Sequence, residues 1–297
     1  MRPNVSRSPI TRMSLPGAGA APFLRATMSR DARGCALAGP ALLNRFPAGA
    51  YCSITWFLEG GVELLSCGGD AGLRQPLARC VVGGCQTAPF MSRNQGEVHA
   101  FFAMFYPDAF HALFGVDLAR VQNRFADARE VLPAHALGLV DAVFAAANDD
   151  ERRRLIEDFI DQWARSAELP AWTRMRRFGG RLTLALASKV LGLGPRQLQR
   201  IAPRQAGASL QTLARLWRGE RSFLRAQRQV LAGREVDMAD HALANEYADQ
   251  SHMVRDCKAQ TGRTPLQLAR DVQSEEADWI YRLEFSLDDD DPPARSA

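Results

Sequence analysis

The stretch Tyr247-Ala248-Asp249-Gln250-Ser251-His252-Met253-Val254-Arg255, followed by Thr261-Gly262-Arg263-Thr264-Pro265, is the most informative part of this 297-residue chain. Within it, Met253, Val254 and Cys257 recur at the spacing of one helix face. Asp249 stands where a carboxylate can cap the free backbone N–H groups at the start of that helix. A second apolar face lies upstream beyond a turn and consists of Met238, Ala239, Ala242 and Leu243. The pattern predicts a helix-turn-helix unit.

A similar pattern lies about fifty residues upstream, at Gly192-Leu193-Gly194-Pro195-Arg196-Gln197-Leu198-Gln199-Arg200. Apolar residues recur at helical spacing on both sides of Gly192, which breaks the helix. They are Leu184, Ala187 and Leu191 before the glycine, and Leu198 and Ile201 after it. Between the two units an apolar stripe runs from about residue 209 to 232, formed by Leu210, Leu213, Ala214, Trp217, Leu224 and Leu231. This stripe predicts a helix roughly 36 Å long at 1.5 Å per residue.

Both stretches resemble the two DNA-reading segments of AraC/XylS-type bacterial transcription regulators, and the resemblance covers roughly residues 175–272. It implies an AraC-type DNA-binding domain at residues 174–285, all-α, with two helix-turn-helix units joined by a long helix. Successive major grooves on one face of DNA lie about 34 Å apart, so a rigid spacer of the predicted length lets one chain read two of them.

Base reading requires hydrogen-bond donors on the early turns of each second helix. Arg196, Gln199 and Arg200 lie at i, i+3 and i+4, which places them on one face. The resemblance assigns base reading to these three and, in the second unit, to Gln250, Ser251, His252 and Arg255. Arginine can bind guanine and glutamine can bind adenine, whereas Arg204 and Lys258 are better placed for phosphates. The alternative is a generic solvated helix face, and for His252 a role in starting its helix.

The chain departs from the family pattern at five positions. Ala202 replaces an aromatic residue, and Pro203 follows it inside a predicted helix, where proline costs about 3 kcal/mol. We therefore expect that helix to end early or to kink. Glu246 stands where the family favours a turn glycine, Asn245 replaces an apolar residue, and Cys257 replaces an aromatic one. These changes leave the surface donors in place, so we expect a DNA binder with unusual or weak specificity.

Charge supports a phosphate-binding surface in the same region. Residues 174–234 contain 14 Lys or Arg and a single acid, Glu220, whereas residues 235–291 contain 5 basic and 15 acidic residues. Such a local excess is typical of a surface that binds nucleic acid, although a solvated basic face would look the same. No apolar run approaches the roughly 18 residues of a membrane span, which argues against a membrane protein.

The rest of the chain predicts an α+β protein with a mixed sheet and helix domain before the DNA-binding domain. Strands are expected at 53–58, 80–82 and 98–106, and helices at 108–114, 134–147 and 151–164, with a linker near 169–171. Residues 31–168 would form a ligand-sensing or dimerisation domain. Residues 1–30 are predicted to be a disordered arm, and 286–297 an acidic disordered tail.

Aromatic residues in the N-terminal region could wall an apolar pocket, although such residues are more often simply core: Trp56, Phe57, Phe101, Phe102, Phe105 and Tyr106. The leading hypothesis is a sequence-specific regulator controlled by a small effector. A regulator controlled by dimerisation or a protein partner is the first alternative. The second is a thiol-based sensor or repair enzyme that uses Cys80 or Cys85.

Six scattered cysteines without a secretory signal indicate reduced thiols in the cytoplasm. Their spacing does not match a zinc site, and the histidines show no catalytic or metal-binding spacing. We therefore expect neither catalytic residues, metal ligands nor a cofactor. The expected partners are double-stranded DNA and RNA polymerase, with a small-molecule effector and a second copy of the chain as further candidates.

Overall fold

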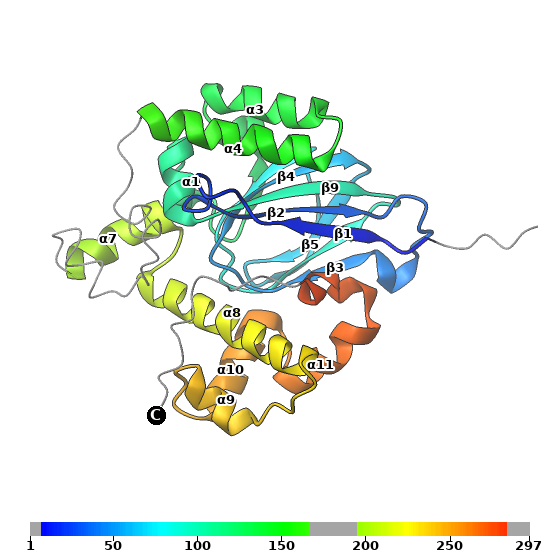
Figure 1. Ribbon diagram of the computed structural model, residues 1–297, viewed down its shortest axis with the longest axis vertical. Coiled ribbons are helices and arrows are strands. Elements are labelled where there is room, and N and C mark those ends of the chain that lie inside the picture. Colours follow the sequence, from blue (N-terminus) through cyan, green and yellow to red (C-terminus); the bar gives the residue numbers. More distant parts are fainter. Residues whose placement is uncertain (1–6, 167–194, 284–297) are drawn as a thin grey trace, which may run out of the picture.

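The computed structural model describes residues 7–166 and 195–283. Two antiparallel sheets with helices on one outer face form the N-terminal part, and helices alone form the C-terminal part (Figure 1). This confirms the predicted order of a β-rich region followed by a helical region. The linker near 169–171, the helix expected around Leu184 to Leu191, and the acidic tail at 286–297 lie outside the described residues.

The larger sheet has six strands in the order β1-β2-β9-β4-β7-β10, all antiparallel. Their bounds are β1 Ile10–Ser14, β2 Leu24–Asp31, β4 Cys52–Glu59, β7 Cys80–Gly83, β9 His99–Phe105 and β10 Phe125–Asp127. The predicted strands at 53–58, 80–82 and 98–106 correspond to β4, β7 and β9. The prediction of a disordered arm at 1–30 is wrong for β1 and β2, which pair with Met13 opposite Met28. Backbone hydrogen bonds to the sheet order a segment whose composition looked disordered.

The smaller sheet has four strands in the order β3-β8-β5-β6. Their bounds are β3 Leu43–Phe46, β5 Val62–Cys67, β6 Asp70–Pro76 and β8 Phe90–Asn94, and the short 3-10 helix η1 (Gly39–Leu42) leads into β3. Gly68 and Gly69 join β5 to β6 with φ of +63° and +94°. Such left-handed backbone favours glycine, which explains the Gly-Gly pair at this turn.

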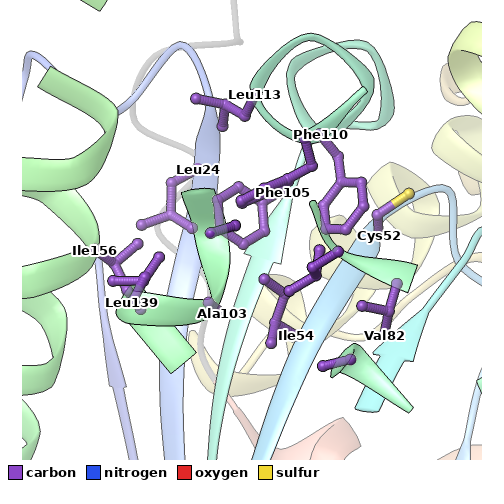
Figure 2. Packing of buried hydrophobic residues seen from close by; sticks show 14 of the residues in the cluster. Leu24, Cys52, Ile54, Val82, Ala103, Phe105, Phe110, Leu113, Leu139 and Ile156 are labelled. Atoms are coloured by element: carbon purple, nitrogen blue, oxygen red, sulfur yellow. The ribbon is translucent and has the colours of Figure 1, made fainter. Parts of the chain in front are cut away.

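Helices cover the outer face of the larger sheet: α1 (Pro107–Phe114), α2 (Ala128–Val131), α3 (Ala134–Ala145) and α4 (Asp149–Ser166), with the 3-10 helix η2 (Leu118–Arg120). The predicted helices at 108–114, 134–147 and 151–164 correspond to α1, α3 and α4. The main core lies between this face and the helices, where Leu24, Ile54, Phe105 and Phe110 pack together (Figure 2). Trp56 joins the two layers by donating from Nε1 to the carbonyl of Val140 at 3.2 Å.

The C-terminal part consists of α7 (Pro195–Ala206), α8 (Leu210–Leu231), α9 (Met238–Ala244), α10 (Gln250–Thr261), α11 (Pro265–Ser274) and the 3-10 helix η3 (Glu276–Arg282). Helix α8 is the long helix that the apolar stripe predicted, and Ser209 caps it by accepting from Thr212 N. Helix α10 approaches α8 at Gly219, where a Cβ atom would lie 2.1 Å from Gln260 Oε1. A larger residue at position 219 would have to displace the Gln260 amide, whereas glycine leaves it in place.

Candidate DNA-reading helices and the cavity behind them

Helix α10 presents a polar face built on a buried apolar one. Asp249 Oδ1 accepts from His252 N at 2.6 Å, as predicted for the helix cap. Met253 is buried in a cluster with Ala242 and Tyr247. On the opposite face the side chains of Gln250, Ser251, Arg255 and Lys258 are exposed. This arrangement brings four predicted DNA-contacting residues onto one accessible surface.

His252 differs from the other predicted base-reading residues because it is half-buried. Its ring meets Tyr247 edge-on, with the ring centroids 5.3 Å apart. Its Nδ1 accepts from Ala248 N at 3.4 Å. The local contacts therefore give His252 a part in shaping the start of α10, which was the alternative interpretation of this residue.

The buried face of α10 is fixed to α8 by polar contacts as well as by packing. Asp256 is buried and accepts from Arg218 Nη2 at 3.1 Å, while the Arg218 guanidinium lies 4.6 Å from the centre of the Tyr247 ring. Gln260 Nε2 donates to the carbonyl of Arg215 at 3.2 Å. Charge-assisted hydrogen bonds of this kind hold a helix in one orientation.

The turn between α9 and α10 shows why two departures from the family pattern are tolerated. Glu246 has φ of +61°, the left-handed conformation in which the family glycine would be relaxed. Asn245 is buried but paired, since its Nδ2 donates to the carbonyl of His241 at 2.8 Å and its Oδ1 accepts from Arg225 at 3.2 Å. The polar side chain at 245 is therefore satisfied, and the strain falls on Glu246.

Helix α7 carries the three predicted base-reading residues of the first unit, and Arg196, Gln199 and Arg200 are all exposed. The expectation that this helix ends early is wrong, because α7 continues past Pro203 to Ala206. Proline at that position removes one N–H donor but still fits helical backbone angles. Ala202, which replaces an aromatic residue of the family, is 5% exposed.

Arg204, predicted to contact phosphate, is 72% exposed, and its Nε lies 3.4 Å from Asp117 Oδ2, next to η2. Gly207 follows α7 with φ of +74°, and a Cβ atom there would lie 3.0 Å from Cys85 Cβ. Helix α7 and the glycine that follows it therefore contact the N-terminal part of the protein, through an exposed ion pair and a close backbone approach.

Part of the basic charge at residues 174–234 has a structural use. On α8, Arg218 binds Asp256, Arg221 lies 3.4 Å from Glu246, and Arg225 donates to the carbonyl of Ala244. These arginines attach α8 to the second helix-turn-helix unit. The count of basic residues alone therefore overestimates the positive charge available for binding phosphate.

A cavity of about 260 Å³ lies between the inner faces of the two sheets and extends to the C-terminal helices. Phe57 and Phe102 line it, whereas Trp56, Phe101 and Phe105 point into the helix-covered core. Successive strand residues face opposite sides of a sheet, which divides the predicted aromatic cluster in two. The prediction of an aromatic wall is correct for Phe57 and Phe102; Trp56, Phe101 and Phe105 are core, and Tyr106 packs against the same core.

Glu220 of α8 forms one polar corner of this cavity. Tyr51 Oη donates to Glu220 Oε2 at 2.8 Å, and Arg25 Nη2 lies 3.8 Å from Glu220 Oε1. Burial, together with the charge of Glu220, raises the pKa of Tyr51 well above its usual value, so the phenol keeps the proton that it donates. The single acid of the basic region therefore attaches α8 to the N-terminal part.

The second polar corner lies at the segment Glu275–Arg282, which we call the closing segment. Arg30 of β2 forms an ion pair with Glu276, donates to Thr11 Oγ1 at 2.8 Å, and lies 4.4 Å above the Trp279 ring. Trp279 Nε1 donates to Asn44 Oδ1 at 2.9 Å. Burial lowers the pKa of Arg30, and the hydrogen bond to Glu276 opposes this.

Asp278 is the most buried acid of the closing segment, with 0% exposure. It accepts from Arg263 Nη1 and Nη2 at 2.6 and 2.7 Å, and from Arg45 Nη1 at 3.1 Å. Arg263 directly follows α10 and Arg45 belongs to β3. The Asp278 carboxylate thus joins the segment after α10 to the smaller sheet.

The cysteines offer little support for thiol chemistry. Cys80 and Cys85 are buried, and burial raises the pKa of each thiol to about 12. A thiol reacts as its thiolate, so both are poor nucleophiles near neutral pH. Within residues 7–166 and 195–283, no group of three His, Cys, Asp or Glu side chains could hold a metal ion. None of the described helices is long and apolar enough to cross a membrane.

Residues 187–271 match a family model described as a helix-turn-helix domain. None of the curated proteins matches this sequence. Among solved structures, an apo variant of ToxT from Vibrio cholerae is 9% identical, with a TM-score of 0.40, over 88% of this chain and 96% of that one. ToxT with a bound unsaturated fatty acid is 10% identical, with a TM-score of 0.36, over 76% and 93%. The AraC-like transcriptional activator CuxR is 12% identical, with a TM-score of 0.24, over 76% and 95%.

Proposed function

We propose that this chain, which carries an AraC-type helix-turn-helix domain at residues 187–271, is a sequence-specific transcription regulator controlled by a small-molecule effector. The observation that carries the proposal is the composition of the cavity wall. It combines both N-terminal sheets with Gly219, Glu220 and Phe223 of α8. A molecule in this cavity would touch the helix that supports α10.

On the DNA side, the proposal rests on exposed donors carried by ordered helices. Arg196, Gln199 and Arg200 would read bases from α7, and Gln250, Ser251, His252 and Arg255 from α10. Arg204 and Lys258 would bind phosphates, which position the protein without specifying sequence. His252 is the weakest of these assignments because its ring already contacts Tyr247.

On the effector side, a ligand changes DNA binding only if it favours one arrangement of the two parts over another. The polar contacts that join these parts surround the cavity: Tyr51 with Glu220, and Arg30 with Glu276. A ligand that alters the spacing between the sheets and α8 would alter these contacts. The cavity would thereby communicate with α10, which α8 holds through Asp256 and Gln260.

The wider biology follows the same proposal: action in the cytoplasm on double-stranded DNA, with RNA polymerase as the partner that responds and a second copy of the chain as a further partner. Control by dimerisation without a small ligand is the alternative, and the cavity favours a ligand over it. The thiol-enzyme alternative is disfavoured by the burial of Cys80 and Cys85.

Selection of random duplex DNA by the purified full-length chain, followed by sequencing of the bound pool, tests the proposal. We expect two short half-motifs whose centres lie about ten base pairs apart, because each helix would enter one major groove. Enrichment of one half-motif alone would mean that a single unit reads bases. A bound pool without any enriched sequence would overturn the assignment of sequence-specific reading.

A further inference from the structure

The cavity wall is mainly apolar, and several of its polar groups are bonded to the protein itself, whereas Arg30 Nε is buried without a hydrogen-bond partner among the described residues. Phenylalanine, leucine, valine and methionine side chains from both sheets form most of it, and Trp279 of the closing segment forms one side. Among the uncharged polar side chains, Asn44 Nδ2 donates to Asn94 Oδ1 at 2.9 Å, and Gln86 Nε2 donates to the carbonyl of Gly84 at 2.9 Å. Such a wall suits apolar surface.

The two charged residues of the wall are Arg30 and Glu220, and each has a counter-ion supplied by the protein. Arg30 is bound to Glu276, and Glu220 is bound to Tyr51 with Arg25 nearby. The wall therefore contributes one positive and one negative group, and each already forms an ion pair; Glu276, the partner of Arg30, also binds Arg282 Nη2 at 2.9 Å. A formally charged ligand would either remain without a counter-ion or displace a carboxylate or a guanidinium from its partner.

Burying a charge without a partner is costly, and breaking an existing buried pair leaves another charge uncompensated. An uncharged ligand avoids both costs and still gains from the removal of apolar surface from water. The charge balance of the wall thus discriminates between ligand classes, although the cavity shape does not.

We propose that the effector cavity takes an uncharged, predominantly apolar small molecule, and that it selects against organic anions and cations of the same size. This inference rests on the proposed function, since it names the class of effector for the same cavity. Arg30 and Glu276 are the residues that set the selectivity, because their pairing removes the cation that an organic anion would need.

Three probes with the same ten-carbon chain test the proposal: 1-decanol below its solubility limit, and decanoate and decylammonium below their micelle concentrations. The readout is the rise in melting temperature of the full-length chain without DNA, since a ligand that binds only the folded state stabilises it. We expect 1-decanol to bind at least about tenfold more tightly than either charged probe. Equal or tighter binding of decanoate or decylammonium, or no binding of any probe, would overturn the proposal.

The variant Glu276→Gln sharpens this test by leaving Arg30 without its carboxylate. We expect decanoate to bind about tenfold more tightly to this variant than to the original protein, with little change for 1-decanol. Glu275→Gln is the matched control, because Glu275 lies 3.9 Å from Arg45 instead. An unchanged preference in Glu276→Gln would contradict the role assigned to the Arg30–Glu276 pair.

The two proposals fail in distinguishable ways. The probe titration is done without DNA, and the DNA selection is done without a probe. Sequence enrichment together with preferred binding of a charged probe would leave the regulator intact and remove the ligand class. Preferred binding of 1-decanol without sequence enrichment would support the ligand class and overturn sequence-specific DNA reading.

Discussion

The two candidate reading helices, α7 and α10, carry similar exposed donors but are held by different neighbours. Helix α10 is attached to α8 through buried Asp256 and through Gln260, and Asp278 binds Arg263 just beyond its end. Helix α7, within the described residues, contacts the N-terminal part through the ion pair of Arg204 and the close approach of Gly207. The comparison teaches that a change in the N-terminal part would reach the two helices by different routes: it would reach α7 through the exposed Arg204 pair and the buried contact at Gly207, and α10 through the buried network behind it.

The largest expected effect concerns Asp278, which is fully buried between Arg263 and Arg45. Asp278→Ala would leave two guanidinium groups without their shared carboxylate, so we expect a loss of about 3–5 kcal/mol in the free energy of unfolding. Urea unfolding of the full-length chain measures it. Asp271→Ala is the control, since Asp271 also lies near Arg263 but is 28% exposed. A loss below about 1 kcal/mol for Asp278→Ala would show that the end of α10 is not anchored there.

A smaller effect is expected for base reading itself. Arg255→Ala on α10 and Arg200→Ala on α7 should each cost about 1–3 kcal/mol in DNA binding and relax base preference at separate positions, one DNA turn apart. Binding titrations on single-base variants of the selected site measure both. Uniform weakening across all sequences would reassign either arginine to phosphate. Relaxation by Arg255→Ala alone would mean that α10 reads bases and α7 only positions the protein.

The turn before α10 gives the next prediction. Glu246 occupies left-handed backbone at a cost of about 1–2 kcal/mol, and glycine avoids this cost but has more freedom to lose on folding. We expect Glu246→Gly to raise the free energy of unfolding by about 0.5–1 kcal/mol, since the exposed contact with Arg221 is worth little. Glu246→Asn should fall between the two, because asparagine tolerates this conformation. Destabilisation by glycine in urea unfolding would show that the Arg221 contact outweighs the strain.

Much of this architecture could be predicted because its signals are local. The apolar stripe of α8, the cap at Asp249 and the short apolar runs of β4 and β9 each arise from residues close together in sequence. Edge strand β1 could not be predicted in this way, because its order comes from pairing with β2 and not from its own composition. Pro203 does not end α7, which continues to Ala206 in spite of one missing hydrogen bond.

Apart from Phe57 and Phe102, the wall of the cavity could not be predicted, because it joins residues far apart in the chain. Arg30 meets Glu276 and Asn44 meets Trp279, and no spacing in the sequence announces either contact. One signal did exist: Glu220 is the single acid among the 14 basic residues of positions 174–234, and an isolated acid in such a stretch indicates a specific contact. In the structure, Glu220 accepts a hydrogen bond from Tyr51 and pairs with Arg25 of β2.

The smallest expected effect would separate the routes to the two helices. Asp117 is 28% exposed and its partner Arg204 is 72% exposed, so Asp117→Asn should change the free energy of unfolding by no more than about 1 kcal/mol. It would nevertheless release Arg204 for a phosphate, so DNA binding should strengthen slightly and its salt dependence should rise by about one counterion. Adding Arg204→Ala to Asp117→Asn should return that dependence to its original value without altering base preference. Titrations across salt concentrations measure both slopes. If Asp117→Asn left the slope unchanged while Arg204→Ala altered base preference, Arg204 would be a base reader and α7 would sit differently on DNA from the way its exposed donors suggest.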